Sequence, residues 1–134
     1  ARNEHIINKI KPALLKKKVV ICDRFTDSTL AYQVYGKKVE IKFINDIHKK
    51  ILGKIKPNLV FILKVSARSS KLRLKKRKSK NRYDNFSQSF YTKAQRSFLK
   101  IAKNKKNYFI LDSSSNNNIL EKNIFNIVKK YLNI

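Results

Sequence analysis

The sequence predicts an α/β fold in which helices flank a parallel sheet. Three short apolar runs, at 19–22, 58–65 and 108–111, have the length of buried strands. Segments with helical periodicity separate these runs, and strands that alternate with helices form parallel sheets. A length of 134 residues allows one domain with one core. No stretch approaches the roughly 18 apolar residues of a membrane helix, so we expect no membrane association.

The expected elements follow the chain in order. A helix over 2–15 contains Pro12, which we expect to kink or end it. After the strand at 19–22, helices are expected over 28–35, ending at Gly36, and over 39–52, with Ile41, Phe43 and Ile44 on the core side. A short helix follows the strand at 58–65, and further helices are expected over 87–103 and 119–132.

Two features indicate that the chain is truncated at its N-terminus. An open sheet of three parallel strands would leave an unprotected edge. The chain also contains no Met and begins Ala-Arg-Asn-Glu. We therefore expect further sequence of the same domain before Ala1.

The charge balance is strongly basic, with 33 Lys and Arg residues against 8 Asp and Glu and a formal net charge of +25. Such a field attracts polyanions, which leaves two classes of partner, nucleic acid and phosphate-rich small molecules. The single cysteine, Cys22, is expected inside the first strand, and its inability to form an internal disulfide fits a reducing, cytoplasmic location. His5 and His48 do not suggest a metal site, and His48 is expected on a helix surface.

The segment that follows the first strand carries the most informative motif. Ligands of open parallel sheets bind beyond the carboxyl ends of the strands, where Asp23 and Arg24 would lie. A strand-end aspartate can hold Mg²⁺, and the planar guanidinium of an arginine grips phosphate oxygens in pairs. A hydroxyl and an aromatic ring on the following helix could contact a planar base. The alternative interpretation is a surface Asp-Arg pair followed by a capped helix.

A second basic cluster follows the second strand, at Arg68, Lys71, Arg73, Lys75, Lys76, Arg77, Lys78, Lys80 and Arg82. Such runs are usually solvated surface, and a nucleic-acid patch is the next interpretation.

In these motifs the chain resembles the bacterial thymidylate kinases. That family has a strand ending in Asp-Arg-(Tyr/Phe/His), followed by Asp-Ser-(Ser/Thr)-x-Ala-Tyr-Gln, which matches residues 23–33. Its Arg-x-x-His and Ile-x-Pro-Ala-Leu motifs match Arg2, His5 and residues 10–14. Its Pro-(Asp/Asn)-Leu strand matches 57–59, and the Arg-(Phe/Tyr)-(Asp/Glu) end of its basic lid matches 82–84. The resemblance covers essentially all 134 residues, as the C-terminal two-thirds of such an enzyme.

The resemblance implies a partial thymidylate kinase domain over 1–134, with a lid at approximately 68–86. The implied fold is that of the P-loop NTPases and nucleoside monophosphate kinases, N-terminally truncated. The implied reaction is phosphoryl transfer from ATP to dTMP, giving dTDP and ADP, with Mg²⁺ as cofactor and a homodimer as the assembly.

The resemblance also implies roles for individual residues. Arg24 would hold the dTMP phosphate, Asp23 would help to position the metal, and Arg2 would contact the thymine edge. Ser28 and Thr29 would lie along the base, Thr29 or Gln33 would supply hydrogen bonds to it, and Tyr32 would sit under the deoxyribose. The lid arginines expected to contact ATP or the transferred phosphoryl group are Arg73, Arg77 and Arg82.

Two departures from the family pattern stand out. No Gly-x-x-x-x-Gly-Lys-(Ser/Thr) loop is present, because the only glycines are Gly36 and Gly53. We therefore expect the 134-residue chain alone to be inactive. Lys64 also replaces an acid that the family usually has at this position. A contact between that acid and the lid is therefore not expected in this chain. A small basic nucleic-acid-binding module remains the alternative function, but Asp-Arg directly after a buried strand favours the kinase.

Overall fold

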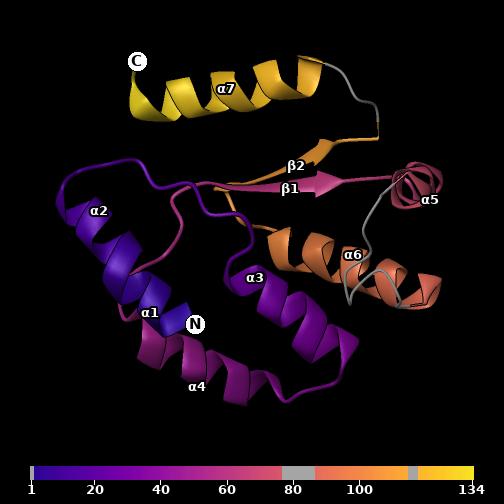
Figure 1. The fold of residues 1–134 in the computed structure, drawn as a ribbon, viewed down its shortest axis with the longest axis horizontal. Helices are drawn as coiled ribbons and strands as arrows, with labels where there is room; N and C mark the ends of the chain where they lie inside the picture. The colour runs from indigo at the N-terminus through magenta and orange to yellow at the C-terminus, as the bar shows by residue number, and fades with distance from the viewer. Residues whose placement is uncertain (1, 77–86, 115–117) are drawn as a thin grey trace. The chain divides into compact units, whose positions relative to one another are not determined.

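The computed structural model describes residues 2–76, 87–114 and 118–134, and the chain divides into two compact units, Ala1–Pro57 and Asn58–Ile134. The first unit contains α1 (Arg2–His5), η1 (Ile6–Ile10), α2 (Lys11–Leu15), α3 (Thr26–Thr29), η2 (Leu30–Gly36) and α4 (Ile41–Leu52), where η marks π-helical segments (Figure 1). The second contains β1 (Val60–Lys64), α5 (Ala67–Lys75), α6 (Gln88–Ala102), β2 (Tyr108–Asp112) and α7 (Asn118–Leu132).

The first helical stretch of unit 1 runs from Arg2 to Leu15 and does not end at Pro12. Its hydrogen bonding widens over η1, where the Lys11 N–H reaches back five residues to the Ile6 carbonyl. A proline lacks an N–H and its ring crowds the preceding turn. The wider π-helical turn directly before Pro12 lets the chain continue as a helix. Ile6 and Ile10 are buried on this stretch.

The second helical stretch of unit 1 is formed by α3 and η2 and ends at Gly36, as predicted. Helix α4 begins after Glu40 and ends at Gly53, whose φ of 56° lies in the left-handed region that suits glycine. Ile44 of α4 is buried, but Ile41 and Phe43 are 46% and 57% exposed. The prediction that these two side chains lie in the core is therefore wrong for this unit.

Residues 19–22 do not form the strand that the sequence predicts. They run as an extended connection between α2 and α3, with Val19 and Ile21 66% and 93% exposed. Cys22 is exposed too, so its predicted burial is also wrong. A strand exists only where a neighbouring strand completes its backbone hydrogen bonds, and no such neighbour is found for 19–22 in the described part of the chain.

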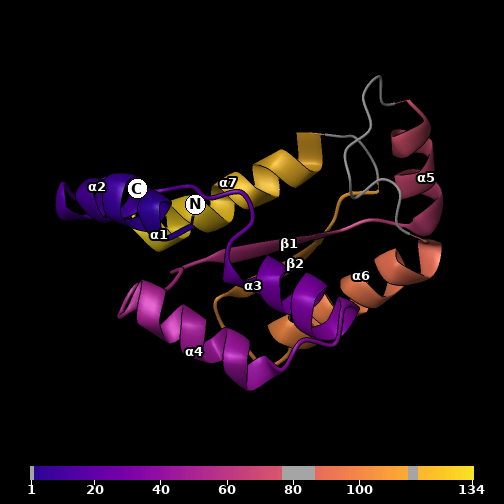
Figure 2. The same ribbon diagram turned by 60° about the horizontal axis from the view of Figure 1, so that its bottom comes forward.

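Unit 2 is built on a parallel pair of strands, as predicted for this part of the chain. Strands β1 and β2 are in register from Val60 opposite Tyr108 to Lys64 opposite Asp112. The rings of Phe61 and Phe109 are neighbours across the pair, with centroids 5.7 Å apart. Figures 1 and 2 show α6 on one face of the strands and α7 on the other. Helix α6 contacts both strands and buries Ala94, Ser97, Ile101 and Ala102.

Serine caps start two helices of unit 2. The Ser66 hydroxyl accepts a hydrogen bond from the Ser69 N–H at the start of α5, and the Ser87 hydroxyl accepts one from the Phe90 N–H at the start of α6. Such caps satisfy backbone donors that a helix leaves without a partner in its first turn.

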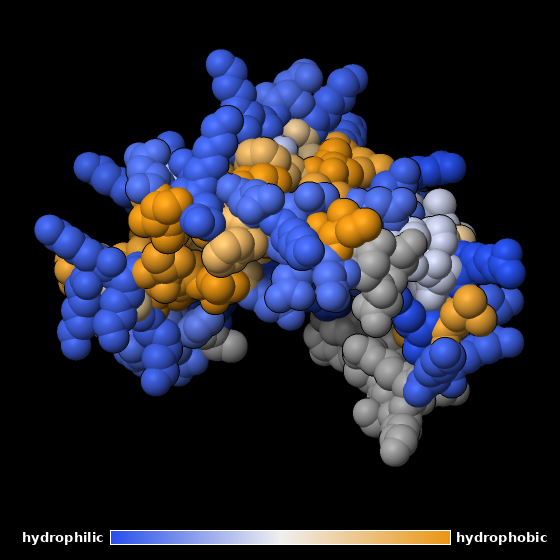
Figure 3. Space-filling view, turned by 90° about the horizontal axis from the view of Figure 1, so that it is seen from above, coloured by the Kyte–Doolittle hydropathy of each residue, from blue (hydrophilic) through white to orange (hydrophobic). Residues whose placement is uncertain are grey.

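Helix α7 keeps much of its apolar face at the surface. Ile119 and Phe125 are 62% and 61% exposed, and apolar patches between hydrophilic side chains are visible in Figure 3. In the described part of the chain, no helix is long and apolar enough to cross a membrane.

Candidate active site

Asp23 and Arg24 form a bend between the connection at 19–22 and helix α3. Arg24 has a φ of +61°, in the left-handed region that a residue with a Cβ adopts at a steric cost. Both residues are exposed. Backbone strain of this kind clusters at ligand-binding and catalytic positions, where the surrounding structure holds it.

The Arg24 guanidinium lies against the helical segment that follows it. Its Cζ is 5.7 Å from the ring centroid of Tyr32 on η2. A cation at this distance from an aromatic ring is attracted by the negative face of the ring. The two residues predicted to contact phosphate and sugar are therefore close together in the folded unit.

A second guanidinium, that of Arg2, joins α1 to α3. Its Nη1 donates a hydrogen bond of 2.7 Å to the Thr29 hydroxyl, and its Nη2 donates one of 3.4 Å to the Phe25 carbonyl. Its Cζ is 6.0 Å from the centre of the Phe25 ring. Arg2 is half-buried. The structure thus brings together Arg2 and Thr29, the two residues for which the family resemblance implies contacts with the same base.

His48 of α4 completes the surroundings of Arg2. Its Nε2 lies 3.4 Å from Nη1 of Arg2, and its side chain is half-buried. Burial, and next the charge of Arg2, lower the pKa of His48, while Asp27 acts in the opposite direction. His48 lies on a helix, as predicted, and its half-buried contact with Arg2 is the feature that the prediction did not include. The sequence contains a signal for the partial burial of His48. This residue follows Ile44 by four positions and precedes Ile51 by three, so all three side chains lie on one face of the helix.

Ser28 and Gln33 lie on the same helical stretch as Thr29 and Tyr32. Ser28 belongs to α3 and Gln33 to η2, and both side chains are half-buried. Thr29 and Gln33 are four residues apart. In a regular α-helix this spacing puts side chains on one face, and the wider π-helical turn of η2 shifts it somewhat. Their roles toward a base stay predictions.

Asp23 is the residue predicted to hold a metal ion. In the described residues no group of three or more histidines, cysteines or acids could enclose a metal by itself. Mg²⁺ does not need such a group, because it keeps several waters and is commonly bound through one or two carboxylates and the phosphates of a substrate. An exposed carboxylate next to Arg24 has the right chemistry for that mode.

In unit 2 the carboxyl ends of the two strands are tied together by polar contacts. The backbone N–H and the hydroxyl of Ser113 both donate to the Lys64 carbonyl, at 2.7 and 3.1 Å. The Ser66 N–H donates to the Ser114 hydroxyl, and Nε2 of Gln95 donates to the Val65 carbonyl. This is the edge of a parallel sheet where ligands bind in open α/β folds.

The lid arginines are described only in part. Arg73 of α5 reaches the strand-end edge, where its Nη2 donates to the Ser113 carbonyl. Arg77 and Arg82 lie outside the described residues, as does the lid from 77 to 86. Lys64, at the position of the family's acid, pairs in register with Asp112. Hydrogen bonds from Ser114, and to a lesser degree the charge of Lys64, lower the pKa of Asp112.

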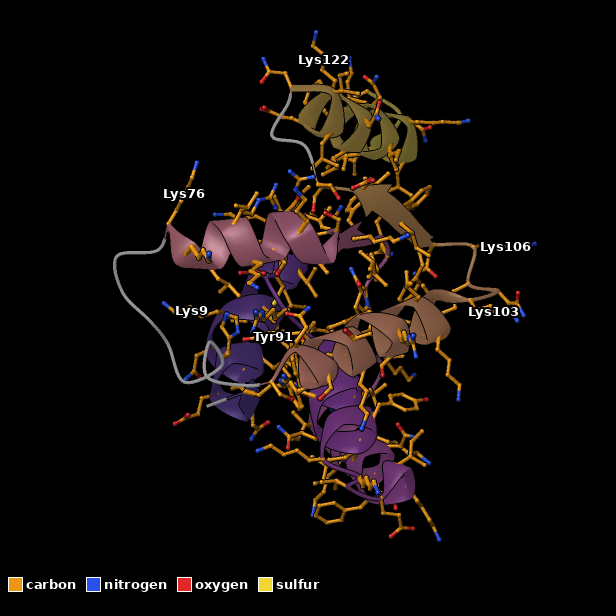
Figure 4. The ribbon with its side chains drawn as sticks, turned by 90° about the vertical axis from the view of Figure 1, so that its right-hand side faces the viewer. Lys9, Lys76, Tyr91, Lys103, Lys106 and Lys122 are labelled. Carbon is orange, nitrogen blue, oxygen red and sulfur yellow. The ribbon has the colours of Figure 1, made fainter. Side chains whose placement is uncertain are left out.

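The lysines in the described part of unit 2 are distributed over several elements. Lys76 follows α5, Lys103 and Lys106 follow α6, and Lys122 lies on α7. Figure 4 shows Lys103 and Lys106 on one side, and Lys76 and Lys122 extending outward elsewhere. A nucleic-acid module would concentrate its charge and exposed aromatic rings on one face. This distribution gives no support to that alternative.

Comparisons with known proteins point to one family. The family model described as thymidylate kinase matches residues 1–124. The thymidylate kinase of Wolbachia pipientis wMel is 44% identical over 101 residues, which are 75% of this chain and 50% of that protein. The thymidylate kinase from Wolbachia pipientis of Culex pipiens is 38% identical over 132 residues, which are 96% of this chain and 62% of that protein.

A solved structure agrees with these sequence matches. The crystal structure of thymidylate kinase from Ehrlichia chaffeensis is similar with a TM-score of 0.71 and 27% identity, over 95% of this chain and 60% of that one. The chain thus spans about half to three-fifths of the length of these relatives. The parallel sheet flanked by helices is consistent with a P-loop kinase fold. By its sequence, its fold and the motif at 23–33, this chain belongs to the thymidylate kinase family.

Proposed function

We propose that this chain forms the dTMP-binding part of a thymidylate kinase, which transfers the γ-phosphoryl group of ATP to dTMP and yields dTDP and ADP. Its relatives are named for that activity. The observation that carries the proposal is Arg24, held at a positive φ beside Tyr32. A surface Asp23-Arg24 pair without a ligand would not explain why the arginine is held at a strained φ next to an aromatic ring.

In this proposal Arg24 binds the phosphate of dTMP. Its guanidinium offers two parallel N–H donors, which fix the phosphate in position as well as in charge. Asp23, the neighbouring acid, would hold Mg²⁺ together with phosphate oxygens. When bound, the ion would supply positive charge at the transferring phosphoryl group. Arg73, Arg77 and Arg82 of the lid would neutralise further charge on ATP, since such transfer depends on positioning and electrostatic stabilisation.

Arg2 and Thr29 would recognise the thymine base. The Thr29 hydroxyl accepts a hydrogen bond from Arg2, so its own proton is available to donate to a carbonyl of the base. Ser28 and Gln33, half-buried on the same stretch, would supply the remaining polar contacts.

Tyr32 would contact the deoxyribose. The sugar of a nucleotide lies between base and phosphate, and Tyr32 lies beside the proposed phosphate ligand Arg24 and three residues after the proposed base ligand Thr29. A bulky ring at that point leaves little room for a 2′-hydroxyl.

The wider setting of the enzyme is also part of the proposal. Residues 1–134 would act as one partial domain, with the lid at approximately 68–86. A homodimer could use α4, whose Ile41 and Phe43 expose apolar surface. The lone cysteine fits a cytoplasmic location.

The test is a nucleotide-kinase assay on the protein at its natural full length. ADP release is followed with dTMP, dUMP, UMP and dAMP as acceptors, and dTMP is expected to give the highest kcat/KM. Arg24→Lys should lower turnover by about 10²-fold, as for the loss of one transition-state contact, whereas the matched exchange Arg96→Lys on the exposed face of α6 should have no effect. Near-normal turnover of Arg24→Lys, or a preference for another acceptor, would refute the assignment.

A further inference from the structure

We propose that His48 is a positioning residue of the thymine pocket, whose neutral imidazole holds the Arg2 guanidinium in the orientation that reads the base. The inference rests on the function proposed above and adds a residue from a different helix to it. It starts from the contacts of Arg2, which define how the guanidinium is oriented.

Nη1 of Arg2 is held from two sides. It carries two hydrogens, and its two neighbours in the described structure are the Thr29 hydroxyl at 2.7 Å and Nε2 of His48 at 3.4 Å. Nη2 contacts the Phe25 carbonyl at 3.4 Å. A guanidinium has five N–H groups, so these contacts leave N–H groups of Nε and Nη2 for a ligand. Without His48, the plane of the guanidinium could rotate about its remaining contacts.

The contact between Arg2 and His48 defines the protonation state of the histidine. A guanidinium only donates hydrogen bonds, so Nε2 of His48 must be the acceptor and must be unprotonated. The proton of the neutral ring is then on Nδ1. Protonation of Nε2 would remove the acceptor and bring two cations face to face, which would push Arg2 from its position.

Two charged groups from other helices shift the pKa of His48. Arg2 on α1 faces it and disfavours its protonation, and Asp27 on α3 favours protonation. The neighbouring segment η2 contains no acidic or basic residue. Burial acts in the same direction as Arg2. His48 is therefore suited to stay neutral at physiological pH and to lose the Arg2 contact in acid.

The experiment measures binding of dTMP and of thymidine by isothermal titration calorimetry, with the protein at its natural full length. Thymidine is the cleaner probe of pH, because it lacks the phosphate whose second proton dissociates near pH 6. The variants are His48→Leu, which removes the acceptor, and His48→Gln, whose amide oxygen can replace it. Asn45→Leu, an exposed position one turn earlier on α4, is the matched control.

The expected result is a Kd for dTMP about tenfold higher in His48→Leu, as for the loss of a hydrogen bond to a charged group. His48→Gln should stay within about threefold of the wild type, and Asn45→Leu should not change. The KM for dTMP should rise with the Kd, while the KM for ATP stays constant. In the wild-type protein, thymidine should bind more weakly at pH 5.5 than at 7.5; in His48→Gln this pH dependence should be absent.

The outcomes separate the two proposals. Equal thymidine affinity at both pH values in the wild type, or unchanged dTMP affinity in folded His48→Leu, would overturn the role of His48 while the kinase assignment stands. The pH comparison needs no variant and so does not depend on how His48→Leu folds. Wild-type protein that binds neither dTMP nor thymidine would instead overturn the proposed function, and the role of His48 with it.

Discussion

The positive φ of Arg24 leads to a quantitative prediction. Two substitutions at this position separate the effect of backbone strain on stability from the effect of losing the guanidinium. Arg24→Ala removes the side chain and keeps a Cβ at a φ of +61°. Arg24→Gly removes the side chain and the strain together. Both variants lose the contact with the Tyr32 ring, so that contribution cancels when they are compared.

The magnitude follows from two opposing effects. A residue with a Cβ in the left-handed region costs about 1–2 kcal/mol. Glycine relieves that cost, but its freedom in the unfolded chain lowers stability by about 0.5–1 kcal/mol. The difference leaves Arg24→Gly about 0.5–1 kcal/mol more stable than Arg24→Ala. If the φ of residue 24 lay outside the left-handed region, Arg24→Gly would be less stable than Arg24→Ala. Only the effect of glycine on the unfolded chain would then remain.

The assay is urea denaturation followed by circular dichroism, with free energies of unfolding compared at fixed pH and salt. Turnover is measured on the same preparations, and both variants should lose it by about 10²-fold or more. An alanine variant at least as stable as the glycine variant would refute the strained backbone. High turnover in either variant would show that position 24 is not a phosphate ligand.

Four other predictions concern single features of the chain. Replacing Tyr32 by Ala should raise kcat/KM for ribonucleotide acceptors relative to dTMP; unchanged discrimination would contradict the sugar contact. Gly53→Ala should destabilise the protein by about 1 kcal/mol in urea denaturation, because open space surrounds the missing Cβ and only the φ of 56° opposes it. Because the pKa of His48 is lowered on folding, the unfolded chain binds the proton first as pH falls. The stability of the wild type relative to His48→Gln should therefore be constant above pH of about 6.5 and fall below it, and a constant difference down to pH 5 would contradict this. The 134-residue chain alone, which lacks a phosphate-binding glycine loop, should form no dTDP in a coupled assay; measurable product would disprove this.

The elements of unit 2 could be predicted from the sequence because their signals are local. Each strand is a short apolar run, and α6 is a long amphipathic stretch with a serine cap. The structure confirms both strands and the helix to within a few residues. Nothing beyond the apolar pattern was needed.

The strand predicted at 19–22 shows the limit of such signals. Its apolar residues have the right composition, but pairing depends on a neighbour that composition does not encode. Exposed Ile41 and Phe43 illustrate the same point, because periodicity identifies an apolar face and not what covers it.

The geometry of the candidate site could be predicted in part. Arg24, Thr29 and Tyr32 belong to one short segment at 23–33, so their proximity follows from the sequence, while their roles toward a nucleotide stay predictions. The contact of His48 with Arg2 could not be predicted, because it joins residues 46 positions apart. Only the folded unit brings α1, α3 and α4 to the same guanidinium.

A crystal structure of the natural full-length protein with bound dTMP tests the central claim most directly. We predict that the Arg24 guanidinium will lie within hydrogen-bond distance of the dTMP phosphate, and that Arg2, still held by Thr29 and His48, will face the thymine. A nucleotide phosphate bound by other residues, with Arg24 directed into solvent, would contradict the account.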